Sequence, residues 1–152
     1  MKRLHHHLLI SLLVFLFAAG PFADEAHGQA GSPGLEVILV KAGNEKPGID
    51  AALRPFASTL QRVFRFESYR MAGRQQLRVV PGGRSVATFP GGQSLHVRSL
   101  ESGPKGMKAE INWKRGRKDL LHTRISLRPG TPAVLGGPKS PEGTWLLILR
   151  LK

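Results

Sequence analysis

The sequence predicts an α+β fold that is mostly β, with an N-terminal β-α-β element followed by an antiparallel β-sandwich or partial barrel. Near the start, an apolar run precedes a segment whose apolar residues have helical spacing. After that segment the apolar period changes from 3.6 to 2, which is typical of half-buried strands. Turn signals then recur about every 8–12 residues, as in sandwiches and barrels.

Residues 1–30 are expected to be a signal peptide rather than part of the fold. A basic start precedes the apolar core Leu8–Ala19, and small residues follow. Spanning a bilayer takes about 20 apolar residues, and Gly20-Pro21 ends this run sooner. Cleavage is expected after Ala30, with Gly20 as the other site, and an uncleaved anchor is the alternative. The sequence thus predicts export to the periplasm or cell surface, with no transmembrane segment after cleavage.

Residues 31–152 are expected to form one β-rich domain, with a strand-helix-strand portion at 35–72 and a β-meander at 76–152. "LEVILVKA" (Leu35–Ala42) is nearly continuously apolar, which predicts a strand buried on both faces. "IDAALRPFASTLQRVFRF" follows with helical spacing, and Asp50 is a candidate N-cap. We expect a loose first turn and then a regular helix from Pro55, because proline is favoured as a first helical residue.

The remaining elements are predicted to be strands. "FESYRMA" and "QQLRVV" are expected to form two short strands, each closed by glycine or proline. "EINWK" places Ile111 and Trp113 on one face. "LLHTRISLR" alternates most clearly, with His122, Arg124, Ser126 and Arg128 on its outward face. "TWLLILRLK" is apolar on both faces before Arg150, so a central strand is expected.

Two Pro-Gly-Gly triplets, at 81–83 and 90–92, raise the question of a phosphate-binding loop. Such a loop needs a following helix whose first amides point at the anion, whereas each triplet leads into a β-patterned run. Proline followed by glycine suits a type II turn. The triplets are therefore predicted to be turns.

The composition narrows the class of partner. The chain has no cysteine and a formal net charge of +13. A cysteine-free core suits a bacterial envelope space better than a disulfide-stapled extracellular scaffold. The excess charge indicates either a solvated surface or attraction to an anionic envelope surface or envelope protein. Nucleic acid is not expected, since the aromatic residues have core spacing rather than that of a stacking platform.

The densest basic cluster is "KRGRK" at Lys114–Lys118. Gly116 interrupts it between two β-patterned runs, which predicts a hairpin tip. The residues predicted to bind a partner are Lys114, Arg115, Arg117, Lys118, Arg124 and Arg128.

Catalysis is not expected, and neither is a cofactor or a metal site. A hydrolytic site needs a nucleophile, a base and an orienting acid that converge. His96 and His122 are candidate bases, but both fall on the outward, basic face of a strand. We expect a non-catalytic binding or accessory module that docks on an anionic partner or adds a strand to a partner protein. An envelope hydrolase using His96 or His122 is the alternative.

Four motifs, taken together, resemble a functionally uncharacterised family of small, exported bacterial β-rich proteins. They are "EVILVKA", "IDAALRPFASTLQRVFRFESYRM", "FPGGQSL" and "TPAVLGGPKSPEGTWLLIL". This resemblance implies export and a β-rich fold but no particular activity.

The C-terminal half is similar to part of the secretin core. The similarity lies in "LHVRSLESGPKGMKAEINW", "LLHTRISLRPGTPAVLGGP" and "WLLILRL". Secretins are outer-membrane rings of secretion systems. The similarity therefore implies an envelope location and strand-mediated assembly.

Overall fold

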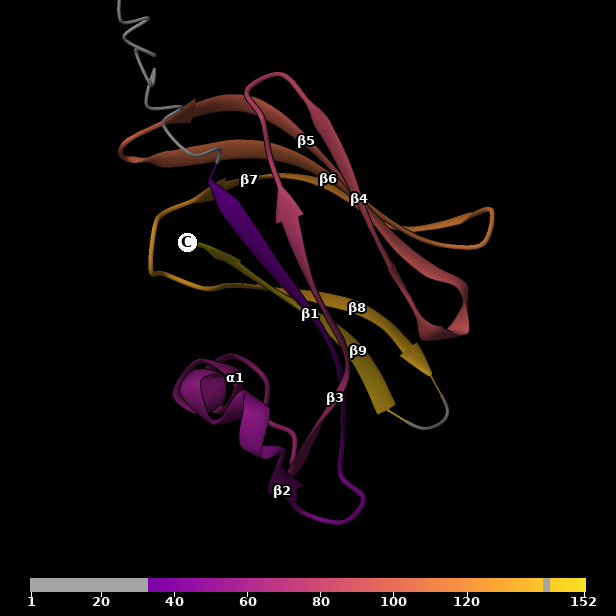
Figure 1. Cartoon of the computed structure of the whole chain (residues 1–152). Coiled ribbons are helices and arrows are strands. Elements are labelled where there is room, and N and C mark those ends of the chain that lie inside the picture. Colours follow the sequence, from indigo (N-terminus) through magenta and orange to yellow (C-terminus); the bar gives the residue numbers. More distant parts are fainter. Residues whose placement is uncertain (1–32, 141–142) are drawn as a thin grey trace, which may run out of the picture.

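The computed structural model describes residues 33–140 and 143–152. The predicted signal peptide, residues 1–30, lies outside the described residues. The described chain forms two β-sheets packed face to face, with a short helical segment against the outer side of one sheet (Figure 1). This is the mostly β, sandwich-like α+β fold that the sequence predicts.

The five-stranded sheet has the order β2-β3-β1-β9-β8 and the four-stranded sheet the order β4-β5-β6-β7. All neighbouring strands are antiparallel except β2 and β3. The five-stranded sheet consists of β1 (Gly34–Gly43), β2 (Gly48–Ile49), β3 (Ser68–Arg78), β8 (Ala133–Ser140) and β9 (Gly143–Leu151). The four-stranded sheet consists of β4 (Arg84–Phe89), β5 (Gln93–Gly103), β6 (Gly106–Arg115) and β7 (Lys118–Leu127).

The main core lies between the two sheets and follows from the period-2 pattern. Ile111 and Trp113 of β6 are fully buried there, as their spacing predicts. The same core contains alternate residues of β1 and β9, among them Val37 and Leu149. Burying such side chains contributes about 1.5–3 kcal/mol each, so this layer is the main stabilising element.

A second core lies on the outer face of the five-stranded sheet. There Ile38 of β1 and Ile148 of β9 pack against the helical segment, which contributes Leu53, Phe56 and Leu60. β1 lies between β3 and β9, and β9 lies between β1 and β8. The predictions of a doubly buried first strand and a central last strand are therefore confirmed.

The first turn of the helical segment is irregular, as expected, but the regular helix begins at Ala57 rather than at Pro55. Ala51–Phe56 is a 3-10 helix, η1, that contains Pro55, and the α-helix α1 is Ala57–Val63. Asp50 is not a side-chain cap. Its carboxylate instead accepts a hydrogen bond from the Met71 amide at 2.8 Å and pairs with Arg70 at 3.1 Å, because β3 lies beside it.

The two short strands expected in 66–80 are one strand, β3, which continues through Gly73. A bulge opposite Leu39 and Val40 shifts the register by one residue, and β3 pairs with β1 on both sides of this point. A Cβ atom at Gly73 would lie 2.7 Å from the Phe89 ring. Gly73 therefore allows close packing with β4 rather than ending the strand.

Both Pro-Gly-Gly triplets are turns. The glycine after each proline has a positive φ, 70° at Gly82 and 76° at Gly91. In the first triplet the Gly83 amide donates to the Val80 carbonyl at 2.9 Å, as in a type II turn. The second triplet, Pro90–Gly92, is a short 3-10 turn, η2, in which Gly91 departs from helical geometry. The first turn leads from β3 to β4 and the second joins β4 to β5. A meander runs from β4 to β7, after which β8 and β9 return to the five-stranded sheet, where β9 pairs with β1.

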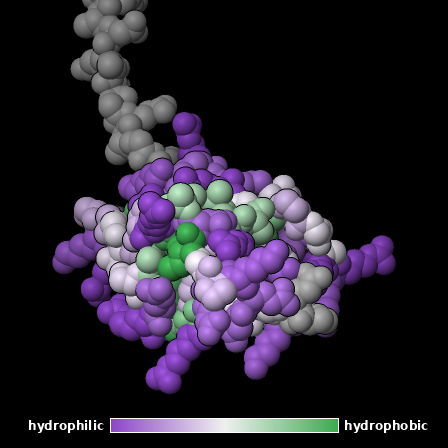
Figure 2. All heavy atoms as spheres, turned by 90° about the horizontal axis from the view of Figure 1, so that it is seen from below, coloured by the Kyte–Doolittle hydropathy of each residue, from purple (hydrophilic) through white to green (hydrophobic). Residues whose placement is uncertain are grey.

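Seen from the side of α1 and β2, the surface is mostly hydrophilic, with a small hydrophobic area near its centre (Figure 2). None of the helices in the described ranges has the length and apolar character that crossing a membrane requires.

Candidate functional site

The outer face of the four-stranded sheet carries most of the polar side chains that the sequence analysis singled out. We call it the basic face and define it by the outward residues of β4 to β7: Arg84, Val86, Ser94, His96, Arg98, Lys108, Glu110, Asn112, Lys114, His122, Arg124 and Ser126. Period-2 alternation places these side chains outward while their neighbours enter the core. The helical segment packs on the other sheet and leaves this face uncovered.

Strand register arranges the basic face in rows. Arg84 is opposite Arg98, Arg98 is opposite Glu110, and Glu110 is opposite Arg124. The next row runs through Val86, His96, Asn112 and His122. The face therefore begins with two cations side by side at its β4 edge.

The carboxylates near this face are all engaged with cationic or histidine side chains. Glu110 lies 3.4 Å from both Arg124 and His122. Two further ion pairs flank the face: Lys114 with Asp119 at 3.2 Å and Lys108 with Glu101 at 2.9 Å.

Arg84 and Arg98, by contrast, make no ion pair with any residue that the structure describes. Like charges directly opposite each other on neighbouring strands are destabilising. The fold thus holds two exposed guanidinium groups together at a cost that an anion would remove.

A hollow of about 250 Å³ lies beside this arginine pair. Its lining includes Arg84, Arg98, His96, Glu110, Asn112 and Lys114. The Oδ1 atom of Asn112 is buried and has no hydrogen-bond partner among the described residues. Buried polar atoms are normally paired, so this unpaired acceptor is an exception, and it belongs to a residue that lines the same hollow as the arginine pair.

The predicted hairpin tip is present. β6 ends at Arg115, β7 begins at Lys118, and Gly116 has a φ of 56° in the turn between them. The Gly116 amide donates to the Gly92 carbonyl at 2.9 Å, which fixes the tip against the β4–β5 turn. Arg115, Arg117 and Lys118 are exposed and have no carboxylate partner among residues 33–140 and 143–152, whereas Lys114 is paired with Asp119.

The other two predicted binding residues, Arg124 and Arg128, lie away from the hairpin tip and in different places. Arg124 lies on the basic face, paired with Glu110. Arg128 follows β7, at the end opposite the hairpin tip. β7 has 10 residues, which at about 3.3 Å per residue puts roughly 30 Å between Arg128 and the tip. The structure therefore groups Arg115, Arg117 and Lys118 but does not bring Arg128 to them.

The two histidines are brought onto one face but into separate contacts. His96 Nε2 lies 3.3 Å from the Ser94 hydroxyl, and His122 Nε2 lies 3.4 Å from Glu110. Asn112 stands between them. The hydroxyl and the acid that a hydrolytic site needs thus contact different histidines. Within the described ranges there is also no group of three or more histidine or acidic side chains that could hold a metal ion.

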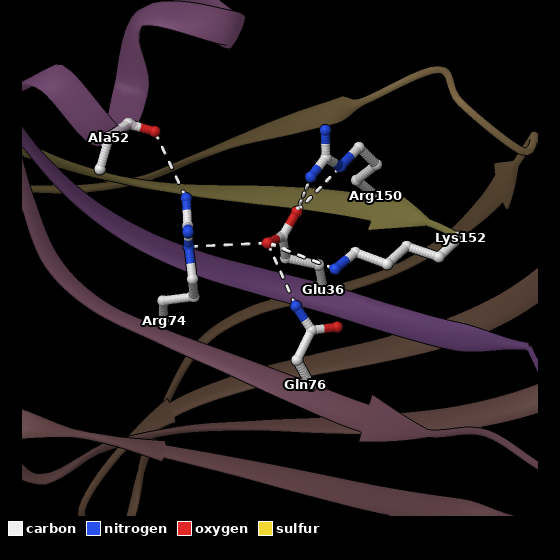
Figure 3. A network of polar contacts seen from close by, with 6 residues as sticks. All are labelled: Glu36, Ala52, Arg74, Gln76, Arg150 and Lys152. Carbon is white, nitrogen blue, oxygen red and sulfur yellow. Dashed lines mark hydrogen bonds and ion pairs between the residues drawn. The ribbon is translucent and has the colours of Figure 1, made fainter.

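One polar cluster escaped the sequence analysis. Glu36 of β1 is 2% exposed, and its carboxylate accepts hydrogen bonds from Arg150 Nε at 2.8 Å and from Gln76 at 3.1 Å (Figure 3). Arg74 lies 3.6 Å and Lys152 lies 3.9 Å from the same carboxylate. The sequence did contain a signal for this cluster, because Glu36 is the one acidic residue in the otherwise largely apolar strand β1.

The geometry around Glu36 is that of a structural connection. Arg74 also donates to the Ala52 carbonyl at 3.3 Å, and Arg150 lies over the Phe56 ring at 5.2 Å from its centroid. The cluster therefore joins β3, β1 and β9 to η1.

Comparison of the chain with protein-family models, curated proteins and solved structures found no match. The resemblances to an exported bacterial family and to the secretin core stay predictions.

Proposed function

We propose that the protein is an exported, non-catalytic binding module of the bacterial envelope that docks on an anionic lipid surface. Docking uses the basic face together with the hairpin tip, and its strength comes from charge rather than from a covalent step. Near an anionic membrane each basic side chain contributes about 1 kcal/mol, and salt screens the attraction.

The observation that carries the proposal is the distribution of unpaired cations. Arg84 and Arg98 on the face, and Arg115, Arg117 and Lys118 at the tip, have no acidic partner in the described part of the chain. All five belong to the four-stranded sheet or its β6–β7 turn. A surface whose positive charge is not neutralised internally attracts anions from outside.

The test is co-sedimentation of the purified protein with vesicles of phosphatidylglycerol and phosphatidylcholine. We expect binding to mixed anionic vesicles at low salt, little binding to pure phosphatidylcholine, and release at high salt. Binding that is equally strong to neutral vesicles would contradict the proposal.

A matched pair of triple variants locates the surface. Replacing Arg115, Arg117 and Lys118 with glutamine removes three charges from the tip, and we expect a roughly 10- to 100-fold weaker affinity for anionic vesicles. The control replaces Arg54, Arg62 and Arg65, which are exposed in or just after the helical segment on the other side of the molecule. Equal losses in the two variants would show that only net charge matters.

A second candidate function is strand addition, favoured by the edge of the four-stranded sheet. β7 pairs with β6 alone, so one side of this strand is open to another chain. β8, the edge strand next to β9 in the five-stranded sheet, has a bulge after Gly136 that makes it a poorer template. Secretin-like assembly through β7 predicts large oligomers in size-exclusion chromatography, and a monomer at every concentration would remove that assembly.

Export itself is tested by fractionation. We expect the protein in the periplasm or at the cell surface, and a variant with charged residues in Leu8–Ala19 to remain in the cytoplasm. The intact wild-type chain dissolved in the cytoplasm would contradict the envelope role.

A further inference from the structure

We propose that the hollow on the basic face binds a phosphate ester of a small polyol. The inference rests on the proposed function, since it names the chemical group in an anionic surface that this face would recognise. The lining of the hollow has a cationic part, which fits the phosphate. It also has a part that accepts hydrogen bonds, which fits a hydroxyl group of the polyol.

The cationic part is the arginine pair. Arg84 and Arg98 project from directly opposite positions on β4 and β5, and both line the hollow. Opposite side chains on one sheet face have Cβ atoms about 4.5–5.5 Å apart. Two guanidinium groups at that spacing can each donate paired hydrogen bonds to one phosphate.

The accepting part lies on β6. The buried Oδ1 of Asn112 has no hydrogen-bond partner in the part of the chain that the structure describes, and Glu110 belongs to the same lining. A fully ionised phosphate has no hydrogen to give to either group, whereas a hydroxyl beside the phosphate has one. Glu110 also repels a second phosphate, which favours a single ester over a polyphosphate.

The size and walls of the hollow agree with a small carbon skeleton. Sites for drug-sized ligands have volumes of about 300–1,000 Å³, and this hollow has about 250 Å³. Val86, whose side chain is exposed on β4, supplies apolar wall beside the polar groups. A phosphate that carries a three-carbon polyol is of the appropriate size.

The first experiment uses soluble probes. sn-Glycerol 3-phosphate, inorganic phosphate and glycerol are each titrated into the protein and followed by amide chemical shifts. We expect glycerol 3-phosphate to bind at least 5-fold more tightly than inorganic phosphate, with shifts in β4, β5 and β6. Equal affinity for the two phosphates, or shifts elsewhere, would overturn the inference.

Matched variants test the lining. Arg98→Gln should weaken glycerol 3-phosphate binding about 10-fold or more. Arg62→Gln removes the same charge from α1, on the other sheet, and should leave it unchanged. Asn112→Ala should abolish the preference for glycerol 3-phosphate over inorganic phosphate. Equal effects of Arg98→Gln and Arg62→Gln, in variants whose thermal unfolding matches wild type, would contradict the assignment.

Vesicle binding then distinguishes a lipid headgroup from a soluble phosphate ester as the ligand. If the ligand is a lipid headgroup, vesicles with phosphatidylglycerol bind more tightly than vesicles of equal charge with phosphatidylserine, and Arg98→Gln removes the difference. If it is a soluble ester, glycerol 3-phosphate binds and the two vesicle types are equivalent. Salt-sensitive binding to both vesicles without binding of any soluble probe would refute this inference and leave the proposed function standing.

Discussion

Trp113 shows how one residue in the core depends on another that is far away in the sequence. Its ring is fully buried, and its indole N–H donates to Gln93 at 3.0 Å. A Cβ atom at Gly137 would lie 2.2 Å from this ring. The period-2 pattern predicts that Trp113 is buried. It does not reveal that a glycine in β8 makes the room, because that contact joins two sheets.

Gly137→Ala should therefore be destabilising. Overpacking a filled core costs about 1–3 kcal/mol, and we expect a loss of that size in the free energy of unfolding from urea denaturation. The control is Gly103→Ala, where no atom lies within 4 Å of the new Cβ. If the two variants have equal midpoints, the packing account of Gly137 is wrong.

Tyr69 links β3 to the end of the helix. Its side chain is fully buried, and its hydroxyl contacts the carbonyl oxygens of Phe64 and of Leu60, the latter at 3.1 Å. Burial raises the pKa of Tyr69 above its ordinary value of 10.0, while a weaker hydrogen bond from the Phe66 amide lowers it. The neutral phenol is thus the form that the fold stabilises.

This pKa direction predicts how stability changes with pH. Because the folded pKa is raised, the contribution of Tyr69 is fully present below about pH 10 and is lost as pH rises further, when the unfolded chain ionises first. Tyr69→Phe should lower the free energy of unfolding by about 1–3 kcal/mol at neutral pH. The difference in the free energy of unfolding between wild type and Tyr69→Phe should become smaller above pH 10 in urea titrations. A difference that stays constant would contradict the raised pKa of Tyr69.

Among elements, β1 is held by more than apolar contacts. Glu36 is buried between β3 and β9, and its cations are only half buried: Arg150 is 33% exposed and Arg74 is 41% exposed. Removing one partner of a buried ion pair is costly because the other charge is left without compensation. The cluster should therefore stabilise the junction of three strands.

Glu36→Gln is expected to lower the free energy of unfolding by about 3 kcal/mol, the lower end for buried pairs, since the remaining cations still reach water. Glu101→Gln breaks an exposed pair with Lys108 and should cost less than about 1 kcal/mol. Chemical denaturation of both variants checks the contrast, and equal losses would remove the special role of Glu36.

Local sequence patterns predict the strands and turns better than they predict which strands pair with one another. The faces of β6 and β7, the hairpin tip and both Pro-Gly-Gly turns follow from residue spacing. The continuity of β3 does not, because Gly73 serves contact with Phe89 rather than termination. The return of β8 and β9 to β1 also depends on long-range pairing that periodicity does not encode.

The candidate site was predicted only in part, for the same reason. The tip residues are neighbours in sequence, so their cluster could be read directly. The Arg84–Arg98 pair required strand register. Folding the chain about the turn after Phe89 pairs that residue with Gln93 and, counting outward, Arg84 with Arg98. The signal was therefore present in the hairpin geometry.

At the scale of the whole molecule, charge and architecture divide between the two sheets. The five-stranded sheet is covered by the helical segment and holds its buried acid in a cluster of cations. The four-stranded sheet leaves its outer face open, with unpaired cations on it and at its tip. Exposed cations with no ion pair in the described part of the chain also lie in and just after the helical segment, at Arg54, Arg62 and Arg65, so the proposal for the four-stranded sheet rests on its open face and its tip rather than on net charge alone.

The most direct measurement is residue-resolved NMR of the protein on nanodiscs that contain phosphatidylglycerol. Line broadening and shift changes should concentrate in β4 to β7 and in the turn at Gly116, leave α1 unchanged, and disappear at high salt. Changes centred on α1 and β2, or spread evenly over both sheets, would contradict the claim that the four-stranded sheet is the docking surface.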